Sequence, residues 1–97
     1  MIDNLRTEID RIDEKLVKLL NRRASKALEI GQHKRKKGWD VTDKEREEDV
    51  LNHVRAINSG PLTEDQLERI YQKLISETKE IQMEVDTNDS RNEARSN

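Results

Sequence analysis

The first third of the chain carries an unbroken helical pattern, and this feature limits most strongly how the chain can fold. Apolar residues alternate at spacings of three and four, as in a helix packed lengthwise on another helix. They are Ile2, Leu5, Ile9, Ile12, Leu16 and Leu19. Neither Gly nor Pro occurs before Gly31, and one Gly costs only about 1 kcal/mol inside a helix. The pattern therefore predicts one helix over residues 2–37, which would be roughly 54 Å long.

A helix of this length does not fit inside a small monomer. The chain has 97 residues, and a compact domain of that size has a radius of gyration of about 12 to 13 Å. Hydrophobic residues make up 31% and charged residues 41%, with one Trp, one Tyr and no Phe, a balance near the border of disorder. Because the helical periodicity argues against disorder, we expect an all-α protein whose long helix is covered by a partner chain.

The composition also excludes several classes of protein. There is no cysteine, so a disulfide scaffold and a cysteine zinc site are excluded, and His33 and His53 are the only imidazoles. We therefore expect neither a metal nor another cofactor. No apolar segment is long enough to span a membrane, and acidic residues stand where a signal peptide would be apolar. With 19 basic and 21 acidic residues, we expect a cytoplasmic protein that binds neither nucleic acid nor membrane.

Two interruptions divide the rest of the chain into two shorter helices. Gly38 ends the first helix, and a second helix is predicted over residues 43–58, with Thr42 or Asp43 as its N-cap. The sequence Asn58-Ser59-Gly60-Pro61 ends that helix.

A capping-box spacing opens the third helix, because Thr63 is followed three residues later by Gln66. The apolar stripe that follows predicts a helix to about residue 85. Residues 86–97 hold one Ala and no larger apolar side chain, so we expect this tail to be disordered and the folded domain to span residues 1–85.

Each predicted helix has polar residues on its apolar face. In the first helix, the three-four alternation continues into Arg23 and Lys34, which lie 11 residues apart, face within about 20° of one another and are separated by roughly 16 Å. The second helix carries Glu47 on its apolar face, flanked by Asp43 and Arg46. The third carries Thr78 and Gln82.

These polar groups have two interpretations. An isolated buried charge costs several kcal/mol, so groups on packing faces should pair with one another or surround a ligand. A ligand here would meet more cations than acids, which favours a small dicarboxylate. Alternatively, the groups form interhelical ion pairs that set register and oligomeric state in a non-catalytic helical dimerisation or regulatory module, or the apolar seam ends at Leu20 and the rest is solvated.

The order and spacing of these residues resemble the small all-helical chorismate mutases of the AroQ class. The similar segments are LRTEIDRIDEKLVKLLNRRASKALEIGQHK, VTDKEREEDVL and YQKLISETKEIQ. The first resembles the family pattern of Leu-Arg, Ile-Asp-x-x-Leu, Arg and Ile-Gly-x-x-Lys, and the second its Asp-x-x-Arg-Glu segment. The resemblance covers about residues 2–85. It implies three helices, one long and two shorter, in an intertwined homodimer whose long helices run antiparallel and form two equivalent active sites.

The resemblance also assigns ligand-contacting positions to eight residues: Arg6, Arg23, Lys34, Asp43, Arg46, Glu47, Thr78 and Gln82. Arg6 lies 17 residues from Arg23 and 28 from Lys34, about 25 and 42 Å along one helix. It can therefore reach the same small substrate only from the partner chain. The roles implied are a carboxylate contact by Arg6 in trans and by Arg23 in cis.

The implied reaction is the Claisen rearrangement of chorismate to prephenate, in the biosynthesis of phenylalanine and tyrosine, with no covalent intermediate and no general acid or base. Lys34 and Gln82 would donate to the ether oxygen, and Glu47, beside Asp43, would accept from the ring hydroxyl. Thr78 would help orient a carboxylate; it stands where the family often has Ser. Arg46 either binds substrate or holds the acids.

The alternative enzyme is an isochorismate-pyruvate lyase, which has the same fold and shares the two arginines and the lysine. Lyases of this kind generally lack a carboxylate at the position of Glu47. The presence of Glu47 therefore favours the mutase.

Overall fold

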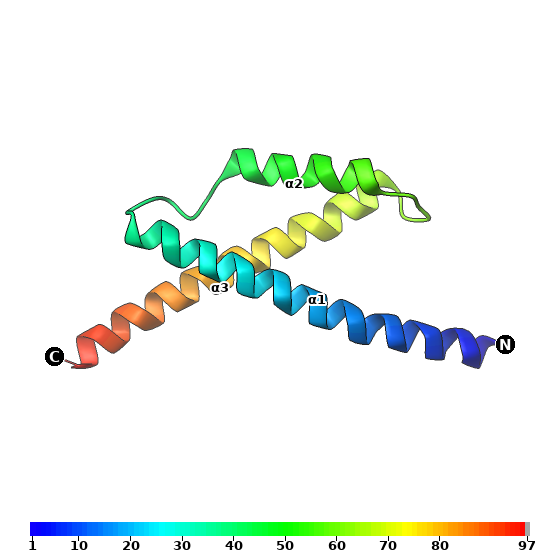
Figure 1. Cartoon of the computed structure of the whole chain (residues 1–97), viewed down its shortest axis with the longest axis horizontal. Coiled ribbons are helices and arrows are strands. Elements are labelled where there is room, and N and C mark those ends of the chain that lie inside the picture. Colours follow the sequence, from blue (N-terminus) through cyan, green and yellow to red (C-terminus); the bar gives the residue numbers. More distant parts are fainter. Residues whose placement is uncertain (97) are drawn as a thin grey trace.

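The computed structural model describes the backbone of residues 1–96 and the side chains of residues 1–83. It contains three helices, α1 (Ile2–Lys36), α2 (Lys44–Ile57) and α3 (Glu64–Ser96), with no strand in the described part of the chain (Figure 1). The all-helical prediction is confirmed, and the bounds predicted for the first two helices are correct to within one residue.

Gly38 ends α1, as predicted, by adopting a positive φ of 70°. Its N–H donates to the Arg35 carbonyl at 3.0 Å, and the Trp39 N–H donates to the Lys34 carbonyl at 2.8 Å. These two bonds form a Schellman motif, which satisfies carbonyl groups that the end of the helix would leave free. The chain then turns toward α2.

Side-chain caps fix where α2 and α3 begin. Asp43 is the N-cap of α2, and its Oδ1 accepts from the Arg46 N–H at 3.0 Å. Before α3, Thr63 and Gln66 exchange two hydrogen bonds, of 3.0 and 3.1 Å, and so form the predicted capping box. Of the two N-caps considered for α2, the structure selects Asp43.

The third helix is longer than predicted. The sequence pattern ends it near residue 85, whereas the backbone stays helical to Ser96. Residues 64–96 contain neither Gly nor Pro, so nothing in this segment breaks a helix that has already formed. The expectation that residues 86–97 are disordered in solution stays a prediction, since their side chains, and Asn97 entirely, lie outside the described part of the chain.

Packing within the single chain is sparse. α3 crosses α1 and packs along α2 (Figure 1), and the molecule measures 61 × 30 × 16 Å with a radius of gyration of 17.3 Å. Among the described side chains, Leu51 and Val54 on α2 are the only large hydrophobic ones that are buried. Beside them, Arg55 forms a 2.6 Å ion pair with Glu68 on α3, and this hydrogen bond raises the pKa of the Arg55 guanidinium. A chain of this shape has little core of its own.

The apolar seam of α1 is open to solvent in the single chain. Every side chain from residue 1 to 19 is exposed, including Ile9 at 54% and Ile12 at 60%. Burying such a side chain contributes about 1.5 to 3 kcal/mol, so the seam represents a large unused source of stability.

Within the described residues, no helix combines the length and apolar character that crossing a membrane requires.

Candidate active site

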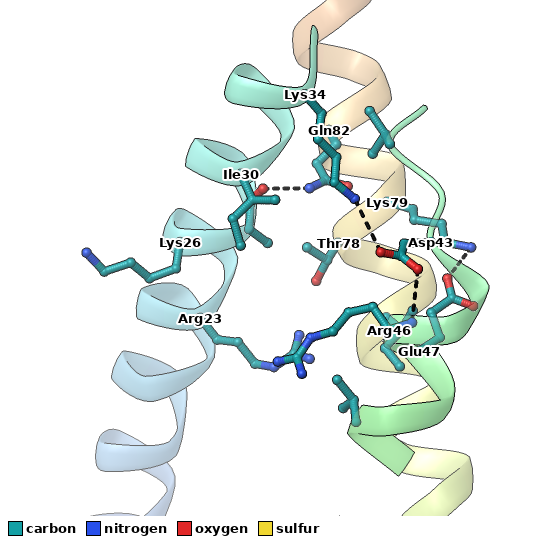
Figure 2. Close-up of a pocket in the computed structure, with 14 residues that line it drawn as sticks. Arg23, Lys26, Ile30, Lys34, Asp43, Arg46, Glu47, Thr78, Lys79 and Gln82 are labelled. Carbon is teal, nitrogen blue, oxygen red and sulfur yellow. Dashed lines mark hydrogen bonds and ion pairs between the residues drawn. The ribbon is translucent and has the colours of Figure 1, made fainter. Parts of the chain in front are cut away.

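All three helices contribute to one cavity of about 270 Å³. It lies between the C-terminal half of α1, the start of α2 and the middle of α3 (Figure 2). Of the residues predicted for the site, the lining includes Arg23, Lys34, Asp43, Arg46, Glu47, Thr78 and Gln82. Residues distant in sequence but assigned to one site are therefore brought together here.

Asp43 connects the cap of α2 to the lysine of α1. While its Oδ1 accepts from the Arg46 N–H, its Oδ2 lies 3.9 Å from the Lys34 ammonium. A separation of 3.9 Å is a loose ion pair, too long for a hydrogen bond. The Lys34 ammonium therefore keeps donors for a ligand while the nearby carboxylate limits where it can move.

Glu47 is held by a lysine of α3. Its Oε1 lies 2.5 Å from the Lys79 ammonium, and the two side chains are 27% and 30% exposed. This oxygen is itself buried and accepts no aligned hydrogen bond within the described structure. Glu47 is thus charge-paired but retains acceptor capacity beside the cavity, which suits it to receive a hydroxyl group.

Two guanidinium groups face one another across the cavity. The Arg23 side chain from α1 and the Arg46 side chain from α2 point toward each other in Figure 2. The Cζ of Arg23 lies 5.8 Å from the centroid of the Tyr71 ring. Neither arginine has a carboxylate partner among the described side chains. Two like charges approach in this way most favourably when an anion lies between them, and each guanidinium can bind a carboxylate through two donors.

Gln82 is fixed by a hydrogen bond to the backbone of α1. Its Nε2 donates to the Ala27 carbonyl at 2.6 Å, and this contact determines which end of the amide is the donor. One N–H of the same nitrogen is left for the cavity. Gly31 eases the approach, because a Cβ at that position would lie 3.2 Å from Nε2 and 3.3 Å from Cγ of Gln82, which is tighter than an ordinary contact.

Thr78 does not yet donate to the cavity. Its Oγ1 lies 2.7 Å from the Leu74 carbonyl and donates to it, one turn back on α3. The hydroxyl must rotate away from this carbonyl before it can donate to a bound carboxylate.

Arg6 lies outside this cavity. It is exposed on the N-terminal part of α1, and the cavity is lined at the other end of the same uninterrupted helix. Within one chain, the structure therefore assembles every predicted site residue except Arg6.

The cavity also contains residues that the sequence patterns did not assign. The apolar part of its wall consists of Ala27, Ile30, Val41, Val50 and Ile75, and two further lysines, Lys26 and Lys79, line its edge. Lys79 follows Ile75 by four residues and precedes Gln82 by three. This helical spacing places Lys79 on the face of α3 that was already predicted to line the site, so periodicity alone could have identified it.

The described residues contain no cluster of three side chains suited to hold a metal ion.

Comparisons with known proteins agree with this arrangement. Residues 5–83 match the family model of chorismate mutase type II. A bifunctional chorismate mutase/prephenate dehydratase of Aquifex aeolicus is 37% identical in an alignment 79 residues long, which covers 77% of this chain but 22% of that protein. A similar bifunctional protein of Neisseria gonorrhoeae is 38% identical over 72 residues, and the match covers 19% of that protein's length. The chain thus spans about a fifth of the length of these curated relatives.

Proteins of similar length also match. A chorismate mutase of Methanocaldococcus jannaschii is 30% identical over 79 residues, which cover 80% of each chain. The solved structure of a chorismate mutase from Thermus thermophilus superposes with a TM-score of 0.83 at 27% identity, covering 84% of this chain and 93% of that one. The chain belongs to the chorismate mutase type II family.

Proposed function

We propose that this chain is a chorismate mutase, an isomerase that rearranges chorismate to prephenate in the cytoplasm as a step toward phenylalanine and tyrosine. The observation that carries the proposal is the pair of facing guanidinium groups, Arg23 and Arg46, neither of which has a carboxylate partner in the described structure. Chorismate is a small dicarboxylate, so it supplies the negative charge that this pair lacks. The near full-length match to a Methanocaldococcus jannaschii protein named chorismate mutase supports the same reaction.

Substrate binding would use the arginines first. Arg23 contacts one carboxylate, and Arg46, whose guanidinium holds neither Asp43 nor Glu47, is free to contact substrate as well. The Thr78 hydroxyl, once rotated from the Leu74 carbonyl, orients a carboxylate. Holding the enolpyruvyl group over the ring in this way converts a flexible molecule into a reactive conformer, and orientation of this kind removes much of the barrier.

The rearrangement itself needs no proton transfer. One C–O bond breaks and one C–C bond forms within the same molecule, and negative charge grows on the ether oxygen as the C–O bond lengthens. Lys34 and Gln82 both line the cavity and lie next to one another (Figure 2), and both donors would strengthen their interaction as this charge develops. Glu47 would accept from the ring hydroxyl through Oε2, because Oε1 is paired with Lys79.

We infer that the chain works as a homodimer with antiparallel α1 helices. The exposed apolar seam over the first 19 residues supports this, because a second copy would cover it. Arg6 supports it independently: it lies about 25 Å from Arg23 along α1, and an antiparallel partner would bring its own Arg6 back to the cavity. Each site would then combine one Arg6 in trans with the remaining residues in cis.

The direct test is the conversion of chorismate. Purified dimer should remove the ultraviolet absorbance of chorismate, and NMR spectra of the mixture should contain prephenate. Chorismate left unchanged would contradict the proposal. Conversion of isochorismate to salicylate and pyruvate would instead identify the lyase, and a dimerisation module would convert neither compound.

Gly31→Ala should lower activity without lowering stability. The added methyl would shift the Gln82 amide by a few tenths of an ångström and strain its bond to the Ala27 carbonyl, so we expect kcat to fall by up to about tenfold, the range of one hydrogen bond. The melting temperature should hold or rise, because Ala favours a helix interior by about 1 kcal/mol over Gly. As a control, Gly31→Ala should have little further effect in a Gln82→Ala background. A loss of similar size in that background would show that Gly31 does not act through Gln82.

A further inference from the structure

Lys79 is a charged residue of the cavity to which the reaction, as derived so far, gives no role. It comes from α3, one residue after Thr78, and its ammonium lies 2.5 Å from Oε1 of Glu47 on α2. Ion pairs on the surface contribute little, and Lys73–Glu77 on the same helix is one of these, with side chains 75% and 52% exposed. The Lys79–Glu47 pair differs because both partners are about 30% exposed or less and both line the cavity.

The pair also forms a thin wall. A second hollow lies between α2 and α3 on the other side of these two residues, and Glu47, Ile75 and Lys79 line both the second hollow and the candidate active site. A Glu47 side chain without its lysine would therefore have space on two sides. The ammonium limits it to the orientation in which the carboxylate reaches the candidate site.

Charge gives a second reason for the pair. The proposed substrate carries two carboxylates, and the Glu47 carboxylate at the edge of the same cavity would repel them if it stood alone. Lys79 pairs with Glu47 and neutralises its charge. What the substrate then meets is a hydrogen-bond acceptor of fixed position with little net charge.

We propose that Lys79 is a positioning residue: it holds Glu47 charge-paired and oriented, so that the enzyme recognises the ring hydroxyl of a dianionic substrate. This role rests on the proposed function. Lys79 does not touch the reacting atoms, and its effect passes through Glu47. The enzyme should therefore depend on Lys79 most strongly for substrates that carry the hydroxyl.

The test compares Lys79→Met, Lys79→Arg and the matched control Lys73→Met, which removes the exposed ion pair of the same helix. With chorismate, kcat/KM should fall about tenfold in Lys79→Met, the range of one charge-assisted hydrogen bond, should largely recover in Lys79→Arg and should not change in Lys73→Met. With an analogue that lacks only the ring hydroxyl, Lys79→Met should lose clearly less activity than with chorismate, because only the repulsion from an unpaired Glu47 carboxylate remains. Adding Lys79→Met to Glu47→Gln should cause no further loss.

Different outcomes overturn different claims. If Lys79→Met loses activity equally with chorismate and the analogue, or adds its full effect to Glu47→Gln, Lys79 acts on the substrate carboxylates or on the fold, and the positioning role is wrong. An active wild type with an unchanged Lys79→Met also overturns this role and leaves the proposed function intact. A folded wild type that converts no chorismate overturns both. Circular dichroism and melting temperature establish that each variant is folded.

Discussion

Arg6→Ala and Arg23→Ala should each give an inactive dimer, and mixing the two variants should restore activity. Loss of a bidentate guanidinium contact to a substrate carboxylate removes both charge and orientation, and we expect kcat/KM to fall by about a thousandfold or more in each homodimer. In a mixed dimer with antiparallel helices, one site receives both substitutions and the other receives neither. Random pairing in equal amounts therefore leaves about a quarter of all sites intact.

The measurement is made by unfolding the two variants together, refolding them and assaying chorismate conversion. Recovery near a quarter of the wild-type rate would support Arg6 acting in trans. If activity does not recover although size measurements detect mixed dimers, Arg6 does not complete the site of its partner. Arg22→Ala is the matched control beside Arg23, since Arg22 is exposed and does not line the cavity; its rate should stay within about twofold of wild type.

The elements that could be predicted from sequence are those set by local chemistry. Gly38 ends α1 because a positive φ suits Gly, Asp43 starts α2 by capping, and Thr63 with Gln66 starts α3 through a capping box. Each of these signals acts over three or four residues. The end of α3 was missed, at residue 85 rather than Ser96, because a polar segment without Gly or Pro gives no local signal for where a helix stops.

Contacts between helices were much harder to predict. Helical periodicity placed Arg23 and Lys34 on one face of α1, but no pattern within a helix indicates that Lys79 reaches Glu47 or that Gln82 bonds the carbonyl of Ala27. Both contacts depend on how α3 lies against its neighbours. The role of Arg46 was open for the same reason: only in three dimensions does its guanidinium point away from both acids and toward Arg23.

Lys34→Ala should be far more damaging than Gln82→Ala. Lys34 places a full positive charge near the ether oxygen, and removing one preorganised donor of this kind lowers kcat by about a hundredfold to a thousandfold. Gln82 offers a neutral amide that also bonds the Ala27 carbonyl, so its removal should lower kcat about tenfold. Because both interactions strengthen in the transition state, the losses should appear in kcat more than in KM. Equal, small losses in the two variants would contradict this assignment.

One complication can be separated by a second substitution. Lys34→Ala also removes the ammonium that lies 3.9 Å from Asp43, leaving a carboxylate to repel the dianionic substrate. Asp43→Asn removes that charge and retains a side chain that caps α2. If the Lys34 charge acts on the transition state, adding Asp43→Asn to Lys34→Ala should raise kcat/KM by less than tenfold. Most of that gain should come from a lower KM. Recovery of most of kcat would mean instead that Lys34 chiefly neutralises Asp43, and Gln82 would then become the main donor to the ether oxygen.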